Sequence, residues 1–174
     1  MQSNFEEIGA YDDHEMIIRL SDVDSGLRGY ISVHRRFGDH PVFGATRIKH
    51  YNSEFDALKD SLNLSRMMTY KNIMAGLKNG GAKAVIITDN NLSGVARAKI
   101  FKAYAQRLNF LSGSFVTGTD VGMSQEDLML IKQSTKHISG VESNPSLFTA
   151  LGLELAIEMC FDKVLQRETQ GGTI

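Results

Sequence analysis

The stretch Gly80-Gly81-Ala82-Lys83-Ala84-Val85-Ile86-Ile87-Thr88 lies near the middle of this 174-residue chain and decides its fold. A compact apolar run of this kind is typical of a strand buried on both faces, as in the centre of a layered sheet. Its one charged side chain, Lys83, follows small residues that let a backbone or a ligand approach closely. The run therefore predicts a central strand with a lysine near its start.

Upstream of this run, the pattern predicts strands and then a helix. Residues 15–20 and 27–34 are apolar and joined by a polar turn, which is the pattern of an antiparallel hairpin, and residues 44–51 predict a third extended segment. Ser53 is a suitable N-cap for the helix that follows. The apolar spacing of this helix predicts a core-facing stripe of Phe55, Leu58, Leu62, Leu64 and Met67.

Downstream, helical patterns alternate with one short strand, at residues 114–117. A helix is predicted over residues 93–108, another after the cap residue Ser124, and a last one over residues 147–165, opened by Asn144-Pro145-Ser146. The inward residues expected in the first of these are Val95, Ala96, Ile100, Ala103 and Tyr104. The alternation predicts an α/β fold, a three-layer α/β/α domain with a mixed sheet because the opening hairpin is antiparallel.

Composition narrows the function classes. A formal net charge of -1 gives no electrostatic reason to expect a nucleic-acid partner or an anionic membrane surface. The single cysteine, Cys160, excludes an internal disulfide, fits a reducing compartment, and is expected to be buried in its apolar helix. No apolar stretch approaches the roughly 18 residues of a membrane span, and the acidic N-terminus lacks a signal core. We therefore expect a soluble, cytoplasmic protein.

Three polar residues are candidates for chemistry. Lys83, at a strand mouth, would lose solvation, which lowers a lysine pKa toward the range useful for proton transfer; the alternative is a lysine that reaches solvent from the strand end. Lys71, in Met68-Thr69-Tyr70-Lys71-Asn72, ends the long helix, where a surface lysine is also favoured by the helix dipole. Asp120 follows a strand, where acids often form loops but where catalytic groups also collect. Two ammonium groups and one carboxylate in one cleft could hold an α-carboxylate and move protons.

These motifs resemble a known family. The chain is similar to the N-terminal substrate-binding and dimerisation domain of the glutamate/leucine/phenylalanine/valine dehydrogenases, and most of all to their leucine and aromatic branch. The resemblance spans nearly the whole chain. Its motifs are Ser25-Gly26-Leu27 with Tyr30-Ile31-Ser32-Val33-His34, Phe43-Gly44-Ala45-Thr46-Arg47, Arg66 to Asn72, Gly80 to Ile87, Thr119-Asp120-Val121-Gly122, and Asn144-Pro145-Ser146 with Thr149-Ala150.

The resemblance implies a role for each site residue. Lys71 would hold the substrate α-carboxylate, Lys83 would help water add to or leave the imine carbon, and Asp120 would shuttle protons to the substrate amine. The remaining implied substrate contacts are Gly44 and Ala45 in the pocket wall, Phe43 and Met68 against the substrate side chain, and Thr149 near the cofactor cleft. No metal ion is expected. The implied reaction is reversible NAD(P)-dependent oxidative deamination of an L-amino acid to its 2-oxo acid and ammonium.

The pocket motif bears on the substrate class. Glutamate-specific relatives carry a lysine there, whereas this chain has Phe43-Gly44-Ala45, and a buried substrate carboxylate without a partner would be costly. A branched aliphatic or aromatic amino acid is therefore expected. Ala45 stands where leucine-type relatives commonly have a second glycine. This difference of about one methyl group does not distinguish a branched aliphatic from an aromatic substrate.

The cofactor half is not found in the sequence. The family places a Rossmann domain after this one, with a Gly-x-Gly-x-x-Gly turn, and no such turn occurs here. We expect a substrate-binding and dimerisation domain at 1–169, a lead-in to a cofactor domain at 170–174, and no NAD or NADP bound to this chain alone. The resemblance also implies a homo-oligomer. The alternatives are a standalone dimerisation module without redox activity and a cofactor-free catalyst that uses Lys83 as a nucleophile.

Overall fold

The computed structural model describes residues 8–89, 92, 94–141 and 145–166, which form two compact units, the first of which ends at Val141. This boundary falls within the range predicted for one functional domain, 1–169, and that extent stays a prediction. The predicted lead-in at 170–174 lies outside the described residues.

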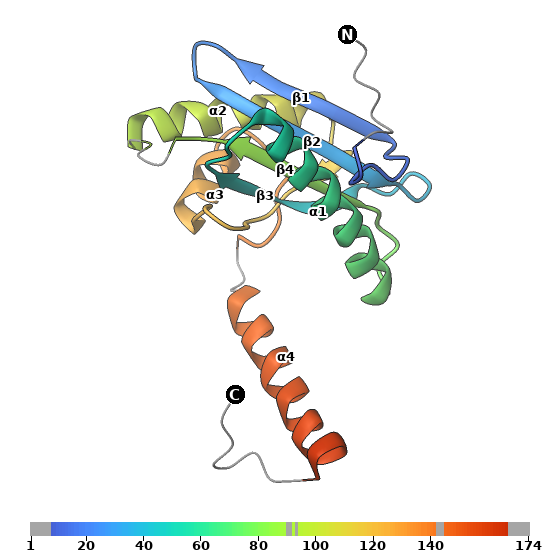
Figure 1. Ribbon diagram of the computed structural model, residues 1–174. Helices are drawn as coiled ribbons and strands as arrows, with labels where there is room; N and C mark the ends of the chain where they lie inside the picture. The colour runs from blue at the N-terminus through green and yellow to red at the C-terminus, as the bar shows by residue number, and fades with distance from the viewer. Residues whose placement is uncertain (1–7, 90–91, 93, 142–144, 167–174) are drawn as a thin grey trace. The chain divides into compact units, whose positions relative to one another are not determined.

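The first unit is built on a five-stranded mixed sheet with the strand order β1-β2-β4-β3-β5 (Figure 1). The β1–β2 and β2–β4 pairs are antiparallel, whereas β4–β3 and β3–β5 are parallel. The predicted hairpin and mixed sheet are therefore confirmed. The strands are β1 Met16–Asp22, β2 Leu27–Arg35, β3 Val42–Lys49, β4 Gly81–Ile87 and β5 Phe115–Val116.

Helices cover both faces of this sheet, which gives the three predicted layers (Figure 1). The helix α1 (Glu54–Met74) packs on one face, while α2 (Gly94–Phe110) and α3 (Gln125–Lys132) pack on the other. Every residue of β4 is buried, as the apolar run predicted. Its side chains alternate between the two cores, with Ala84 and Ile86 toward α2 and α3, and Val85 toward α1.

The buried stripe of α1 differs from the one that apolar spacing predicted. Leu58 and Leu62 are buried as expected, but Phe55 and Met67 are 54% and 56% exposed. Small and polar residues complete the buried stripe instead, namely Ala57, Ser61, Ser65, Thr69 and Asn72. Val95, expected inward in α2, is likewise exposed because it lies in the first turn, outside the buried part of that helix. In α1, side-chain size and hydrogen bonding decide which residues face the sheet.

The helix starts agree with the expected caps. Ser53 Oγ accepts a hydrogen bond from the backbone N–H of Asp56 at 3.1 Å, which satisfies one free donor of the first turn of α1. Ser124 and Asp127 form a reciprocal capping box at the start of α3. These local hydrogen bonds explain why both helices begin where the sequence predicted.

The glycine pair before Lys83 is a point of close backbone approach. A Cβ atom on Gly81 would overlap the backbone of Met68 and Thr69 in α1, and one on Gly80 would overlap the backbone of Arg35 at the end of β2. The last turns of α1, the end of β2 and the start of β4 therefore meet where side chains are absent. This contact fixes the end of α1 against the first residues of β4.

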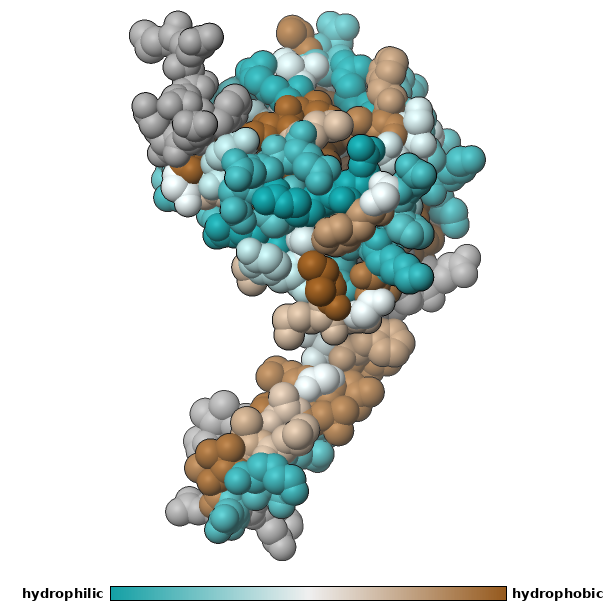
Figure 2. All heavy atoms as spheres, turned by 90° about the vertical axis from the view of Figure 1, so that its right-hand side faces the viewer, coloured by the Kyte–Doolittle hydropathy of each residue, from teal (hydrophilic) through white to brown (hydrophobic). Residues whose placement is uncertain are grey.

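The second unit is helical. It comprises α4 (Pro145–Cys160), which the sequence predicted, and a π-helical continuation η2 (Phe161–Leu165). No residue of α4 is buried in the described structure, although Figure 2 shows that much of its surface is hydrophobic. Cys160 is exposed, so the expectation of a buried cysteine is wrong. None of the helices described has the length and apolar character needed to cross a membrane.

The close approach at Gly81 yields a stability prediction. Gly81→Ala should lower the free energy of unfolding by about 3 kcal/mol, because the new methyl group must push α1 away from the sheet. Urea denaturation followed by circular dichroism measures this loss. Gly94→Ala is the matched control, since nothing lies within 4 Å of its Cβ position, and it should change stability by less than about 0.5 kcal/mol. Equal effects of the two substitutions would contradict the packing argument.

Candidate active site

The predicted pocket motif and the predicted lysine lie side by side in the sheet. In the parallel register of β3 and β4, Phe43 pairs with Gly81, Gly44 with Ala82, and Ala45 with Lys83. On the other side of β4, Lys83 pairs with Ser32, whose hydroxyl lies 2.7 Å from that of Ser61 in α1. Directly paired residues project to the same face of a sheet, so Lys83 and Ala45 face α1.

Lys83 is buried, with only 4% of its surface exposed, and its Nζ lies 2.9 Å from Oδ2 of Asp120. Burial lowers its pKa, and the positive charge of Arg47 acts in the same direction, while Asp120 opposes the shift. The predicted loss of solvation is thus present in the structure. A lysine of this kind gives up its proton more readily than a lysine in water.

Asp120 reaches Lys83 because its loop continues alongside β3. The backbone N–H of Thr46 donates to Gly118 at 2.9 Å, and that of Ile48 donates to Val121 at 3.0 Å. Burial by itself opposes ionisation of Asp120, but hydrogen bonds and charge from Lys83 and Arg47 outweigh it and hold the pKa of this carboxyl below its usual range. The loop therefore supplies an ionised carboxylate to the lysine on β4.

Arg47 is a site residue that the sequence reasoning missed. Its Nε donates to Oδ2 of Asp120 at 2.8 Å, and its Nη1 donates to Oδ2 of Asp60 in α1 at 3.0 Å. The same oxygen of Asp60 accepts the hydroxyl of Tyr51 at 2.6 Å. Tyr51 and Asp60 also line an open cavity of about 400 Å³, so the network reaches solvent at this end. The missed signal was strand alternation, which puts Arg47 on the same face as Ala45.

Lys71 and Met68 lie on the flank of α1 that includes Asp60. The positions 60, 64, 68 and 71 follow one side of a helix, and Asp60 on that side is bonded to Arg47 of β3. Asn72 donates to the carbonyl of Phe43 at 3.5 Å, which holds this turn beside the pocket motif. Lys71 is exposed, and no hydrogen bond or ion pair of its ammonium group is found among the described residues.

Register, close backbone approach and an ion pair thus link six predicted site residues in the first unit: Phe43, Gly44, Ala45, Met68, Lys83 and Asp120. Lys71 lies in the same unit, one turn after Met68 in α1. Thr149 is the exception, because it lies in α4 of the second unit, where its Oγ1 donates to the carbonyl of Pro145 at 3.0 Å. Its role near the substrate stays a prediction. Chemically, the first unit combines a desolvated lysine, a carboxylate in contact with it, and a second lysine able to bind an anion.

Fold and site together define the class of α/β domain found in amino-acid dehydrogenases. The crystal structure of L-tryptophan dehydrogenase from Nostoc punctiforme superposes with a TM-score of 0.71 at 33% sequence identity, covering 94% of this chain and 45% of that one. Residues 14–137 match the dimerisation domain of the Glu/Leu/Phe/Val dehydrogenases. The chain belongs to the Glu/Leu/Phe/Val dehydrogenase family.

Curated relatives support the same family. Leucine dehydrogenase from Geobacillus stearothermophilus is 38% identical over 148 residues, which are 81% of this chain and 39% of the relative. L-tryptophan dehydrogenase from Nostoc punctiforme is 36% identical over 163 residues, which are 91% of this chain and 45% of the relative. The chain thus spans about two fifths of the length of these relatives.

The charge arrangement yields a prediction for Arg47→Gln. Removing this guanidinium takes an opposite charge from Asp120 and a like charge from Lys83, so the pKa of both groups should rise. NMR titration of the Asp120 carboxyl and the Lys83 ammonium measures both. Arg107→Gln is the matched control, because Arg107 of α2, on the opposite side of the sheet, pairs with Asp22 of β1 at 3.4 Å and should leave both values unchanged. A fall in either pKa in Arg47→Gln would contradict the assignment.

Asp120 also predicts a pH dependence of stability. Because its pKa is lower in the folded chain than in the unfolded chain, its ionised form stabilises the fold fully above about pH 5. This stabilisation is lost as the pH falls below about 4, through the folded-state pKa. The stability difference between the wild type and Asp120→Asn should therefore shrink on acidification, measured by urea denaturation from pH 7 to pH 3. A difference that stays constant over this range would count against the lowered pKa, and the exposed Asp24→Asn serves as the control.

Proposed function

We propose that this chain is the substrate-binding domain of an NAD(P)-dependent L-amino-acid dehydrogenase. The reaction is the reversible oxidative deamination of a branched-chain or aromatic L-amino acid to its 2-oxo acid and ammonium. The observation that carries the proposal is the buried Lys83, 2.9 Å from the half-buried Asp120 and next to the half-buried pocket motif, in a chain of this family. An ion pair that only stabilised the fold would not need a buried lysine, nor a second, exposed lysine on the neighbouring flank of α1.

Each residue has a proposed role that its surroundings support. Lys71 binds the substrate α-carboxylate, since its ammonium is exposed on the flank of α1 beside the pocket motif. Lys83 exchanges a proton with the water that adds to, or leaves, the imine carbon of the substrate. Its lowered pKa suits this task. Asp120 accepts and returns the proton of the substrate amine, because its carboxylate is ionised and in contact with Lys83. Arg47 keeps Asp120 ionised and oriented.

The charges around the pocket support an uncharged substrate side chain. Besides the two lysines, Arg47 is a cation on the face of Ala45, and its guanidinium already bonds to Asp60 and Asp120. A glutamate side chain entering here would have to compete with both carboxylates, which is costly at a partly buried site. The pocket motif itself, Phe43 to Ala45, offers apolar surface. Leucine, valine, phenylalanine and tryptophan are therefore the proposed candidates.

The residues described do not fit a dinucleotide. A Rossmann site needs a glycine-rich turn between a strand and a helix, but residues 88–93, which connect β4 to α2, include no glycine in the sequence, and Gly94 is already the first residue of α2. NAD or NADP, which would accept the hydride, is therefore given no site among the described residues. Thr149 of the second unit is proposed only to lie near the substrate and the cofactor cleft.

A homo-oligomer in the cytoplasm is the proposed setting. The family description names this a dimerisation domain, and β1 is an edge strand of the sheet whose backbone groups can pair with another chain. A protein with one cysteine also fits a reducing compartment. The proposed small-molecule partners are the amino acid and its 2-oxo acid.

Lys71→Ala provides the direct test of the substrate site. Loss of the ammonium that pairs with the α-carboxylate should weaken binding of 4-methyl-2-oxopentanoate at least about thirtyfold, measured by isothermal titration calorimetry. Phenylpyruvate should bind with a similar response, whereas 2-oxoglutarate should bind the wild type more weakly. Lys132→Ala is the matched control, because Lys132 is also an exposed lysine in the last turn of a helix, α3. It should change the affinity by less than about twofold.

Two outcomes would overturn the proposal. Equal affinities of the wild type and Lys71→Ala would remove the carboxylate-binding role. Failure of every 2-oxo acid to bind would favour the alternative of a dimerisation module without a substrate.

A further inference from the structure

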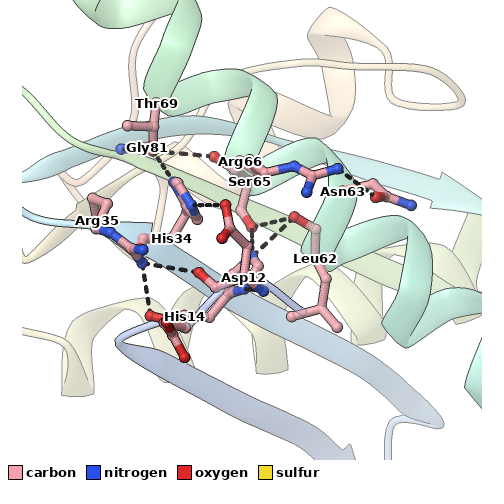
Figure 3. A network of polar contacts seen from close by, with 11 residues as sticks. Asp12, His14, His34, Arg35, Leu62, Asn63, Ser65, Arg66, Thr69 and Gly81 are labelled. Carbon is pink, nitrogen blue, oxygen red and sulfur yellow. Dashed lines mark hydrogen bonds and ion pairs between the residues drawn. The ribbon is translucent and has the colours of Figure 1, made fainter. Parts of the chain in front are cut away.

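A polar network whose histidines are buried lies between α1 and β2, apart from the Lys83–Asp120 pair (Figure 3). It joins the turn before β1, the strand β2, the middle and end of α1, and the first residue of β4. Its members in Figure 3 include Asp12, His14, His34, Arg35, Leu62, Ser65, Thr69 and Gly81. The proposed function leaves these residues without a role.

His34 is the centre of the network. It is 3% exposed, its Nδ1 lies 2.9 Å from Oγ1 of Thr69, and its Nε2 lies 3.1 Å from Oδ2 of Asp12. The hydrogen bond from His34 lowers the pKa of Asp12, and burial lowers the pKa of His34, so a carboxylate faces a neutral imidazole. A carboxylate only accepts, so Nε2 carries the proton and Nδ1 accepts from the hydroxyl of Thr69.

Thr69 passes this orientation on to β4. Its Oγ1 accepts a hydrogen bond from the backbone N–H of Gly81 at 3.1 Å. The hydroxyl of Thr69 has two acceptors, Nδ1 of His34 at 2.9 Å and the carbonyl of Ser65 at 3.4 Å, and the shorter bond takes the proton. The bonds then run in one direction, from Gly81 to Thr69, then to His34 and then to Asp12. Such a chain fixes the rotamer of Thr69, because the oxygen must receive one proton and give another.

The first two members of this series of hydrogen bonds, Gly81 and Thr69, lie close in sequence to the two proposed substrate lysines. Thr69 stands two residues before Lys71 in α1, and Gly81 stands two residues before Lys83 in β4. Outside the sheet ladder, the backbone N–H of Gly81 donates a hydrogen bond to Thr69 and to no other described residue. Asn72 adds a second link between the same elements, donating to the carbonyl of Gly80 at 2.9 Å. The distance between the two lysines therefore depends on how α1 is held against the start of β4.

We propose that His34 is a positioning residue of the substrate site, which acts through Thr69 and Gly81 to fix the separation of Lys71 and Lys83. The inference rests on the proposed function, because it concerns the geometry of the same two lysines. His34 itself lies on the far side of Thr69 and touches neither of them. The competing interpretation is a network that only stabilises the fold.

Four variants separate these interpretations. His34→Asn keeps an amide oxygen near the position of Nδ1 and so retains an acceptor for Thr69, whereas His34→Gln keeps an amide N–H near Nε2 and retains the bond to Asp12 instead. Thr69→Ser retains the hydroxyl, and Thr69→Val removes it at nearly constant volume. Leu108→Val is the control for stability, because Leu108 is fully buried in the core on the opposite face of the sheet.

Two measurements are made on each variant, with urea denaturation to record stability. Calorimetry gives the dissociation constant of 4-methyl-2-oxopentanoate. NMR gives the pH titration of the Lys83 ammonium, assigned by its loss in Lys83→Arg, and this measurement needs no substrate.

Positioning through Thr69 predicts that His34→Gln and Thr69→Val weaken binding about tenfold and shift the Lys83 titration, as expected for the loss of one buried hydrogen bond. His34→Asn and Thr69→Ser should stay within about twofold of the wild type, as should Leu108→Val despite its lower stability. The proposal is overturned if His34→Asn behaves like His34→Gln, or if stability falls while both site measurements stay unchanged. Should Lys71→Ala leave binding unaltered, the substrate assignment fails, and the Lys83 titration alone still decides the positioning role.

Discussion

The close backbone contacts of the Gly80–Gly81 pair, made by Gly81 with α1 and by Gly80 with the end of β2, are the constraint on which the rest of this structure depends. Any side chain at either glycine would overlap the backbone of α1 or of β2. Because the contact is backbone to backbone, it leaves little freedom for the helix to slide or tilt. The hydrogen bonds of Thr69 and Asn72 then set the register of α1 against β4. Lys71 and Lys83 take their positions from this register.

A buried lysine is tolerated at this site because charges of both signs surround it. Lys83 contacts Asp120, Asp120 contacts Arg47, and Arg47 contacts Asp60, which also accepts from Tyr51. Each carboxylate is thus shared by at least two donors, which offsets part of the cost of removing the charges from water. The arrangement keeps Asp120 ionised while burial makes Lys83 easier to deprotonate. Because both pKa values are lowered, the carboxylate stays ionised while the amine loses its proton more readily.

The sequence predicted elements more reliably than it predicted their faces. The run that became β4 was identified because a compact apolar stretch is typical of a strand buried on both faces. In α1 the apolar spacing pointed to Phe55 and Met67, yet the structure buries Ser61, Ser65 and Thr69. A prediction from apolar periodicity assumes that the buried face of a helix is apolar. Here the face is close to the sheet, so small residues that hydrogen-bond to Ser32, His14 and His34 fit better.

The sequence by itself determined the α/β class, the central strand and the helix caps, and it singled out Lys71, Lys83 and Asp120 as candidates. These depend on local composition, periodicity and motif spacing, which a linear chain displays directly. Only the tertiary structure decided that Arg47 bonds to Asp120 and Asp60, and that His34 is linked to Gly81 through Thr69. These partners are far apart in the chain and come together through strand register and helix docking. The physical reason is that hydrogen bonds and ion pairs act over about 3 Å in space, which sequence separation does not encode.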